Sequence, residues 1–150
     1  MTGYPGTGGG PSAGERTLSA AKFWPGAAAT ALVTALSGLV VTLIVRAFGL
    51  DPLAPPWLPE LTLSVRFAVL GFIAALLAAV LLYLLELSTP GGESFFGWIV
   101  GLLVVASVIL PFVYDATAGD RVATALVHLS LGVPILGLLP GVARRALVWR

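Results

Sequence analysis

The sequence predicts an all-α integral membrane protein, a bundle of four transmembrane helices with a disordered N-terminal tail. Of its 150 residues, 58% are hydrophobic and 10% are charged, whereas soluble domains carry about 25% charged residues. The mean hydropathy is +1.02. Four apolar runs are each long enough to cross a hydrocarbon core about 30 Å thick. They cover residues 27–48, 65–87, 95–114 and 122–142.

The first 22 residues differ from the rest of the chain because glycine, proline and serine are abundant in them. Such a segment cannot bury enough apolar surface to offset the entropy lost on ordering, so we expect a disordered cytoplasmic tail over residues 1–22. Residues 23–150 then form the four-helix transmembrane domain. The first apolar run is longer than the roughly 7 to 15 residues of a secretory signal, which favours a helix that stays in the membrane.

Turn-forming residues mark the ends of the apolar runs. Asp120 is expected to cap the N-terminus of the last helix. The connection 51–60 contains four prolines around Trp57, so we expect an extended, stiff loop at one membrane interface. The boundary groups are Trp24-Pro25-Gly26, Asp51-Pro52, Thr89-Pro90-Gly91-Gly92 and Gly119-Asp120.

Positively charged residues near the helix ends predict the orientation, because cytoplasmic segments carry the excess of lysine and arginine. In a four-helix bundle both terminal segments lie on one side, and this side has five such residues against three on the other. We therefore expect a multi-pass protein of the plasma (cell) membrane with both termini in the cytoplasm. The two sets are Arg16, Lys22, Arg144, Arg145 and Arg150, and Arg46, Arg66 and Arg121.

Small residues recur at four-residue spacing in each apolar run, a pattern that lets helix backbones approach closely. Ordinary packing within one bundle explains this pattern, and we favour that interpretation over a dedicated contact with a second copy or another membrane protein. Both interpretations stay open. The sets are Ala27, Ala31 and Ala35; Gly71, Ala75 and Ala79; Gly97 and Gly101; Gly137 and Gly141.

His128 is the one ionisable residue well inside an apolar run, where charge is costly. Thr42 and Ser107 fall at a similar depth on neighbouring helices, so we expect a polar contact among these three side chains. The first interpretation is a neutral imidazole that fixes helix packing. The alternative makes His128 a proton-relay or ligand-binding residue that faces a cavity open to the outer side.

Charged residues near the outer ends of the helices are nearly balanced in sign, and we expect them to pair with one another. Arg46 ends the first run, and Asp115 or Asp120 is expected to neutralise it, while Arg121 opens the last run. These residues are candidates for interface charges rather than for substrate binding.

At the inner end, Glu86 closes the second run. A carboxylate there lies against the negative end of the helix dipole, which predicts a basic partner such as Arg144 or Arg145. Glu86 is therefore another candidate interface charge.

Enzyme signatures are missing from the sequence. It has no cysteine, a single histidine, and no nucleophile elbow or phosphate-binding glycine loop. We therefore expect no catalytic, cofactor-binding or metal-binding residues and no cofactor. A net charge of +1 gives no basic surface for nucleic acid. The expected surroundings are the lipid bilayer and either a second copy or a membrane-protein partner.

Three segments carry a resemblance to a known group: LLYLLE ending at Glu86, FFGWIVGLLVVASVILP ending at Pro111, and DRVATALVHLSLG around His128. Over residues 27–143 the chain resembles the uncharacterised actinobacterial membrane proteins grouped as domain of unknown function 6069. The PPWLP loop and the distance from His128 to Pro140 depart from that group. The resemblance implies a four-helix membrane fold in an actinobacterial plasma membrane, and it implies no mechanism.

The leading hypothesis for function is a structural or interaction role, such as that of an accessory subunit. The alternative is a small-solute transporter or channel subunit with a polar site near His128, although the spans have no deep carboxylate of the kind such proteins use. A membrane enzyme is a third hypothesis. The depth of a polar cavity at His128 would separate these hypotheses.

Overall fold

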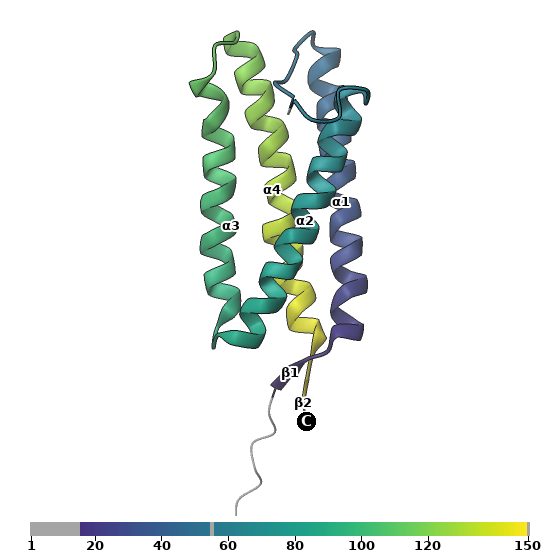
Figure 1. Ribbon diagram of the computed structural model, residues 1–150, viewed down its shortest axis with the longest axis vertical. Helices are drawn as coiled ribbons and strands as arrows, with labels where there is room; N and C mark the ends of the chain where they lie inside the picture. The colour runs from purple at the N-terminus through teal and green to yellow at the C-terminus, as the bar shows by residue number, and fades with distance from the viewer. Residues whose placement is uncertain (1–15, 55, 150) are drawn as a thin grey trace, which may run out of the picture.

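The computed structural model describes residues 16–54 and 56–149. Four long helices run up and down, and two short strands join the ends of the chain (Figure 1). All four helices are long and apolar enough to cross a membrane, so the predicted fold class is confirmed. The elements are β1 (Arg16–Leu18), α1 (Ala20–Ala47), α2 (Leu63–Ser88), α3 (Gly92–Ile109), the 3-10 helix η1 (Leu110–Val113), α4 (Ala118–Ala146) and β2 (Leu147–Trp149).

The two short strands that flank the helices pair with each other below the bundle (Figure 1). β1 and β2 form an antiparallel ladder in which Thr17 lies opposite Val148, and the Ser19 N–H donates to the Ala146 carbonyl at 2.9 Å. Part of the predicted tail, residues 16–22, therefore belongs to β1 and the start of α1. The remainder of that prediction, residues 1–15, lies outside the described residues.

The helices do not pack equally. α1 lies against both α2 and α4, whereas α3 stands at one edge of the bundle. α2 is slanted, so it lies beside α3 where both chain ends emerge and beside α1 at the opposite end (Figure 1). In the most apolar window of α3, 17% of the residues are buried, against 28% to 39% in the other three helices. α3 is therefore the least buried helix.

Close backbone contact joins α1 to α2 at two glycines. A Cβ atom on Gly71 would lie 3.2 Å from the Thr34 carbonyl oxygen, and one on Gly38 would lie 3.1 Å from the Phe67 carbonyl oxygen. Buried threonines nearby satisfy their own hydroxyls, as where Thr42 donates to the Gly38 carbonyl. Glycine and back-bonded threonine thus let two helices touch without leaving polar atoms unpaired.

The four small-residue sets lie in two different environments, two inside the bundle and two on its surface. The sets on α1 and α2 pack inside the bundle, since Ala27, Ala31, Gly71, Ala75 and Ala79 are all buried. On α3 and α4, by contrast, a Cβ atom would meet nothing within 4 Å at four positions. These are Gly97, Gly101, Gly137 and Gly141.

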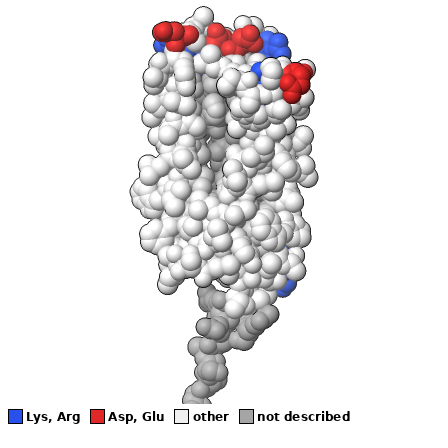
Figure 2. Space-filling view, viewed as in Figure 1, with Lys and Arg blue, Asp and Glu red and all other residues white. Residues whose placement is uncertain are grey.

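Charged side chains gather at the two ends of the molecule, and a band without charge separates them on the face shown in Figure 2. We call the end with the 48–62 connection the loop end and the end with β1 and β2 the terminal end. This distribution is what a bilayer requires of a spanning bundle.

Candidate functional site

The first turn of α4 holds the 48–62 connection in place at the loop end. Thr117 is the N-cap, and its Oγ1 accepts from the Asp120 N–H at 3.2 Å while donating to Asp120 Oδ2 at 2.6 Å. The other oxygen, Asp120 Oδ1, accepts from the Asp51 N–H at 2.8 Å. The prediction that Asp120 caps α4 was wrong, because Asp120 sits one turn inside as the partner of the cap.

Thr124, one turn further along α4, holds the 48–62 connection by a second hydrogen bond. Its buried Oγ1 accepts from the Leu53 N–H at 2.8 Å and donates to the Asp120 carbonyl at 2.7 Å. Leu53 and Ala54 are consequently held beside α4, where they help to line a cavity. Thr124 was not among the predicted site residues, although a threonine four residues before His128 is a local hydrogen-bonding signal.

His128 is fixed by two neighbours. Its Nδ1 lies 3.0 Å from the Thr124 carbonyl oxygen, and its ring forms a T-shaped pair with the ring of Phe67 on α2, with centroids 6.0 Å apart. Since a carbonyl oxygen only accepts, the proton belongs on Nδ1, and a neutral ring then offers Nε2 as an acceptor. No hydrogen bond from the described residues reaches Nε2.

The expected contact among His128, Thr42 and Ser107 is absent from the described part of the structure. Thr42 donates to the Gly38 carbonyl at 2.6 Å, and Ser107 donates to the Val104 carbonyl at 2.9 Å. Each side chain bonds within its own helix, because a carbonyl one turn earlier is always within reach. Ser107 and His128 do line the same cavity, whereas Thr42 is fully buried between helices.

A cavity of about 530 Å³ lies above His128, between the 48–62 connection, η1 and α4. We call it the loop cavity. Polar side chains from two segments line it, since Tyr114 and Asp115 follow η1 while Thr124 and His128 belong to α4. His128 therefore faces a cavity at the loop end, as the alternative interpretation of this residue required.

A second cavity, of about 450 Å³, extends from His128 toward the middle of the bundle between α2, α3 and α4. We call it the crevice. Its walls are apolar apart from His128 and Ser107. The hollow in the half of the molecule nearer the loop end is visible in Figure 2. His128 lines both spaces, so the loop cavity and the crevice adjoin at this residue.

The loop-end charges are paired differently from the prediction. Arg46 Nε lies 3.8 Å from Asp51 Oδ1, and Asp120 is occupied by Thr117, so neither Asp115 nor Asp120 neutralises Arg46. Asp115 is exposed at the rim of the loop cavity.

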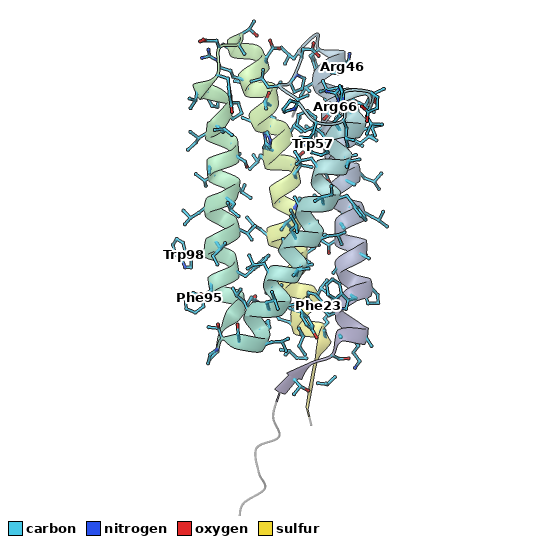
Figure 3. All side chains as sticks on the ribbon, in the orientation of Figure 1. Phe23, Arg46, Trp57, Arg66, Phe95 and Trp98 are labelled. Carbon is cyan, nitrogen blue, oxygen red and sulfur yellow. The ribbon has the colours of Figure 1, made fainter. Side chains whose placement is uncertain are left out.

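The other two arginines at the loop end, Arg66 and Arg121, form no ion pair with the described residues. Arg66 Nε donates to the Leu61 carbonyl at 3.0 Å, and its Nη2 donates to the Pro59 carbonyl. Arg66, at the loop end in Figure 3, thereby holds the last part of the 48–62 connection against the start of α2. Arg121 has a sealed Nε atom for which the described residues provide no acceptor.

At the terminal end, Arg144 pairs with Glu93 rather than with Glu86. Arg144 Nε donates to Glu93 Oε2 at 2.9 Å, and Nη2 donates to Oε1. The bidentate pair links the first turn of α3 to the last turn of α4. The expected partnership of Glu86 with Arg144 was therefore wrong, and Glu93 at a helix N-terminus was the better candidate by the same dipole argument.

Taken together, the site offers hydrogen-bond acceptors at the junction of a polar and an apolar space. Within residues 16–54 and 56–149, no group of three His, Cys, Asp or Glu side chains could hold a metal ion. Four apolar helices with charged ends and a crevice between them define a multi-pass membrane protein. This chain belongs to the family of unknown function DUF6069, whose family model matches residues 18–147. No curated protein and no solved structure matches it.

The family match confirms the resemblance stated from the sequence and extends it at both ends. It begins at Leu18 and finishes at Leu147, which are paired residues of β1 and β2. The 48–62 connection, the loop cavity and the crevice all lie inside the matched region. The family therefore includes the whole bundle and the candidate site.

Proposed function

We propose that this protein is a non-catalytic interaction protein of the actinobacterial plasma membrane, an accessory subunit that assembles with a second copy through α3. Both termini lie in the cytoplasm in this proposal, because the terminal segments carry the larger number of lysine and arginine residues. The observation that supports self-association most strongly is the pair of open glycines on the least buried helix.

Gly97 and Gly101 lie four residues apart on one face of α3, and no neighbouring atom occupies the space beside them. Phe95 and Trp98 extend from α3 away from the bundle (Figure 3), and Trp98 is 72% exposed. Trp98, three residues before Gly101, lies beside the shallow depression that the two glycines leave, and such a surface suits a second helix.

A second copy fits this surface because a bilayer gives every copy the same orientation. A two-fold axis along the membrane normal then places α3 beside α3 in parallel, which is the geometry that Gly-xxx-Gly contacts support. Gly97 of each copy would meet the other at the same depth. The open glycines of α4, Gly137 and Gly141, provide the competing surface that the experiment must separate.

Solute transport is the second candidate, supported by the loop cavity that reaches His128. A transport path would have to continue past His128 through the crevice, whose walls are apolar. An apolar continuation is unfavourable for a small polar solute. The geometry therefore supports an interaction role better than a transport role.

Self-association can be measured by energy transfer between donor- and acceptor-labelled chains in liposomes. The chain has no cysteine, so one cysteine introduced at Ser12 gives a unique labelling site. Wild type is expected to show transfer above random proximity. Gly97→Leu/Gly101→Leu should weaken association by about tenfold, equivalent to about 1.4 kcal/mol.

The matched control is Gly137→Leu/Gly141→Leu, which makes the same change at equally open glycines on α4. This control should associate like wild type. Loss of transfer in the α4 variant with retention in the α3 variant would assign the contact to α4 instead. No transfer in wild type would refute self-association.

A further inference from the structure

The loop cavity and the crevice share His128 but differ in polarity. Four of the nine residues that line the loop cavity are polar, among them Tyr114, Asp115 and Thr124, against two of the thirteen that line the crevice. Their volumes of about 530 and 450 Å³ lie within the range of small-molecule sites. A space with several polar groups that is continued by a nearly apolar one matches an amphipathic molecule.

The two spaces also follow the polarity of the bilayer. His128 lies ten residues into α4, counted from Ala118, so it is about 15 Å along the helix from that end. The crevice continues from His128 to Ile135, about 10 Å deeper. A chain in the crevice would therefore run parallel to the lipid tails, with its head toward the loop end.

Entry from the bilayer is open between α2 and α3. Leu77 of α2 and Leu103 of α3 line the crevice, and they are 65% and 62% exposed. α2 leans away from α3 toward the loop end (Figure 1), which widens the space in the direction of His128. A membrane-dissolved molecule could enter sideways without its tail crossing water.

The polar groups at the junction mainly accept hydrogen bonds. His128 Nε2 has no partner among the described residues while Nδ1 is held by the Thr124 carbonyl. At the rim of the loop cavity, Asp115 adds carboxylate oxygens. Thr124 already donates its hydroxyl hydrogen to the Asp120 carbonyl. The complementary head group is a donor, a hydroxyl or an ammonium, and a carboxylate would be repelled by Asp115.

We propose that the loop cavity and the crevice together bind one single-chain amphipathic molecule, with a hydroxyl or amine head at His128 and an aliphatic tail between α2 and α3. The inference goes beyond the proposed self-association and uses a neighbouring face of α3. The α3 residues that line the crevice are Val100, Leu103, Val104 and Ser107, and by helical spacing they centre about 90° around the helix from Gly97 and Gly101. The binding site therefore adjoins the glycine surface without including either glycine.

The test uses the full chain in phosphatidylcholine nanodiscs, because the choline head has no hydrogen-bond donor. The probe is a long-chain primary alcohol that carries a diazirine in its chain. After photolysis, mass spectrometry should place the label on crevice residues such as Leu77 and Leu103. The unlabelled alcohol should compete at least fivefold better than a fatty acid of equal chain length.

Two variants probe the two ends of the site. Ala74→Phe should fill the crevice and remove the specific label, whereas Ala28→Phe, the same change at an exposed position of α1, should leave it. His128→Ala should weaken competition by the alcohol about fivefold. His128→Gln, which restores an acceptor, should recover most of that loss.

Even labelling of lipid-facing residues such as Leu32 on α1, with equal competition by alcohol and acid, would overturn the proposal. This comparison needs only the wild-type protein, so it tests the binding site even if Ala74→Phe fails to fold. Self-association measured by energy transfer is an independent readout. Its failure would leave the labelling result unchanged, and the reverse also holds.

Discussion

The bundle consists of a closely packed unit of α1, α2 and α4 and a more exposed helix, α3, although both parts are built from the same residue types. In the three-helix unit, glycine brings backbones together, as where Gly71 approaches the Thr34 carbonyl. On α3, Gly97 and Gly101 face open space. Small residues at four-residue spacing therefore do not by themselves indicate where a helix contact is made.

The difference follows from the slant of α2. α2 touches α3 near the terminal end and leaves it toward the loop end (Figure 1), so α3 keeps full packing only over its first turns. Phe96 and Val100 are buried there, whereas Val105 and Ile109 are exposed. One face of α3 lines the crevice and the adjoining face carries the open glycines, which makes this helix the one on which both proposals depend.

The largest effect should come from filling a close contact in the three-helix unit. A Cβ atom on Gly71 would already lie 2.7 Å from Leu131 Cδ2, so Gly71→Leu should lower the free energy of unfolding by about 3 kcal/mol. Unfolding in mixed micelles with increasing SDS measures it. Gly97→Leu, the same change on α3, should cost less than about 0.5 kcal/mol, and similar losses in the two variants would erase the distinction between the regions.

The next effect concerns the turn that joins α2 to α3. A Cβ atom on Gly92 would lie 2.6 Å from the carbonyl carbon and oxygen of Leu85. Because backbone atoms cannot move aside as side chains do, Gly92→Ala should cost about 2 kcal/mol and displace the start of α3. Ser94→Ala at an exposed neighbouring position serves as the control, and an unchanged Gly92→Ala protein would show that α3 is not fixed by this turn.

A smaller effect should separate two threonines that both precede helices. Thr117 caps α4 through the Asp120 N–H, whereas Thr62 occupies the N-cap of α2 without a side-chain bond. Thr117→Ala should therefore lower the free energy of unfolding by about 1 kcal/mol, and Thr62→Ala by much less. Equal losses, measured by the same SDS titration, would refute the capping account.

The smallest effect should come from the ion pair that joins α3 to α4. The Arg144 side chain is 70% exposed, and exposed pairs contribute little because water competes for both charges. Arg144→Gln should lower the free energy of unfolding less than Thr117→Ala does. The control variant Arg145→Gln should have the same stability as Arg144→Gln. A large loss in Arg144→Gln alone would mean that this pair, rather than apolar packing, holds α3.

The fold could be predicted because run length and hydropathy are sufficient for membrane helices, where each backbone group must be satisfied within its own segment. The predicted start of the first helix at residue 27 was late, since α1 begins at Ala20. Pairing of β1 with β2 could not be foreseen from three-residue segments without periodicity. Such short strands carry almost no local signal.

The candidate site was predicted only in part. His128 was a candidate site residue, and the structure places it at a cavity at the loop end, a position that only the alternative interpretation of this residue included. Its expected partners were wrong because depth alone says nothing about the rotation of each helix. Thr124, whose carbonyl holds His128, could have been predicted from its spacing, since a side chain often bonds to the carbonyl four residues earlier in a helix.

Cysteine cross-linking from α3 tests the account most directly. Ser94, Gly97 and Gly101 share one face of α3 by their spacing, and the chain has no cysteine of its own. In native membranes, Ser94→Cys should form a disulfide-linked dimer on oxidation, and adding Gly101→Leu should suppress it. Ser88→Cys, an exposed position in the last turn of α2, should stay monomeric. Equal cross-linking at Ser88 and Ser94, or none at Ser94, would contradict the assignment of α3 as the contact surface.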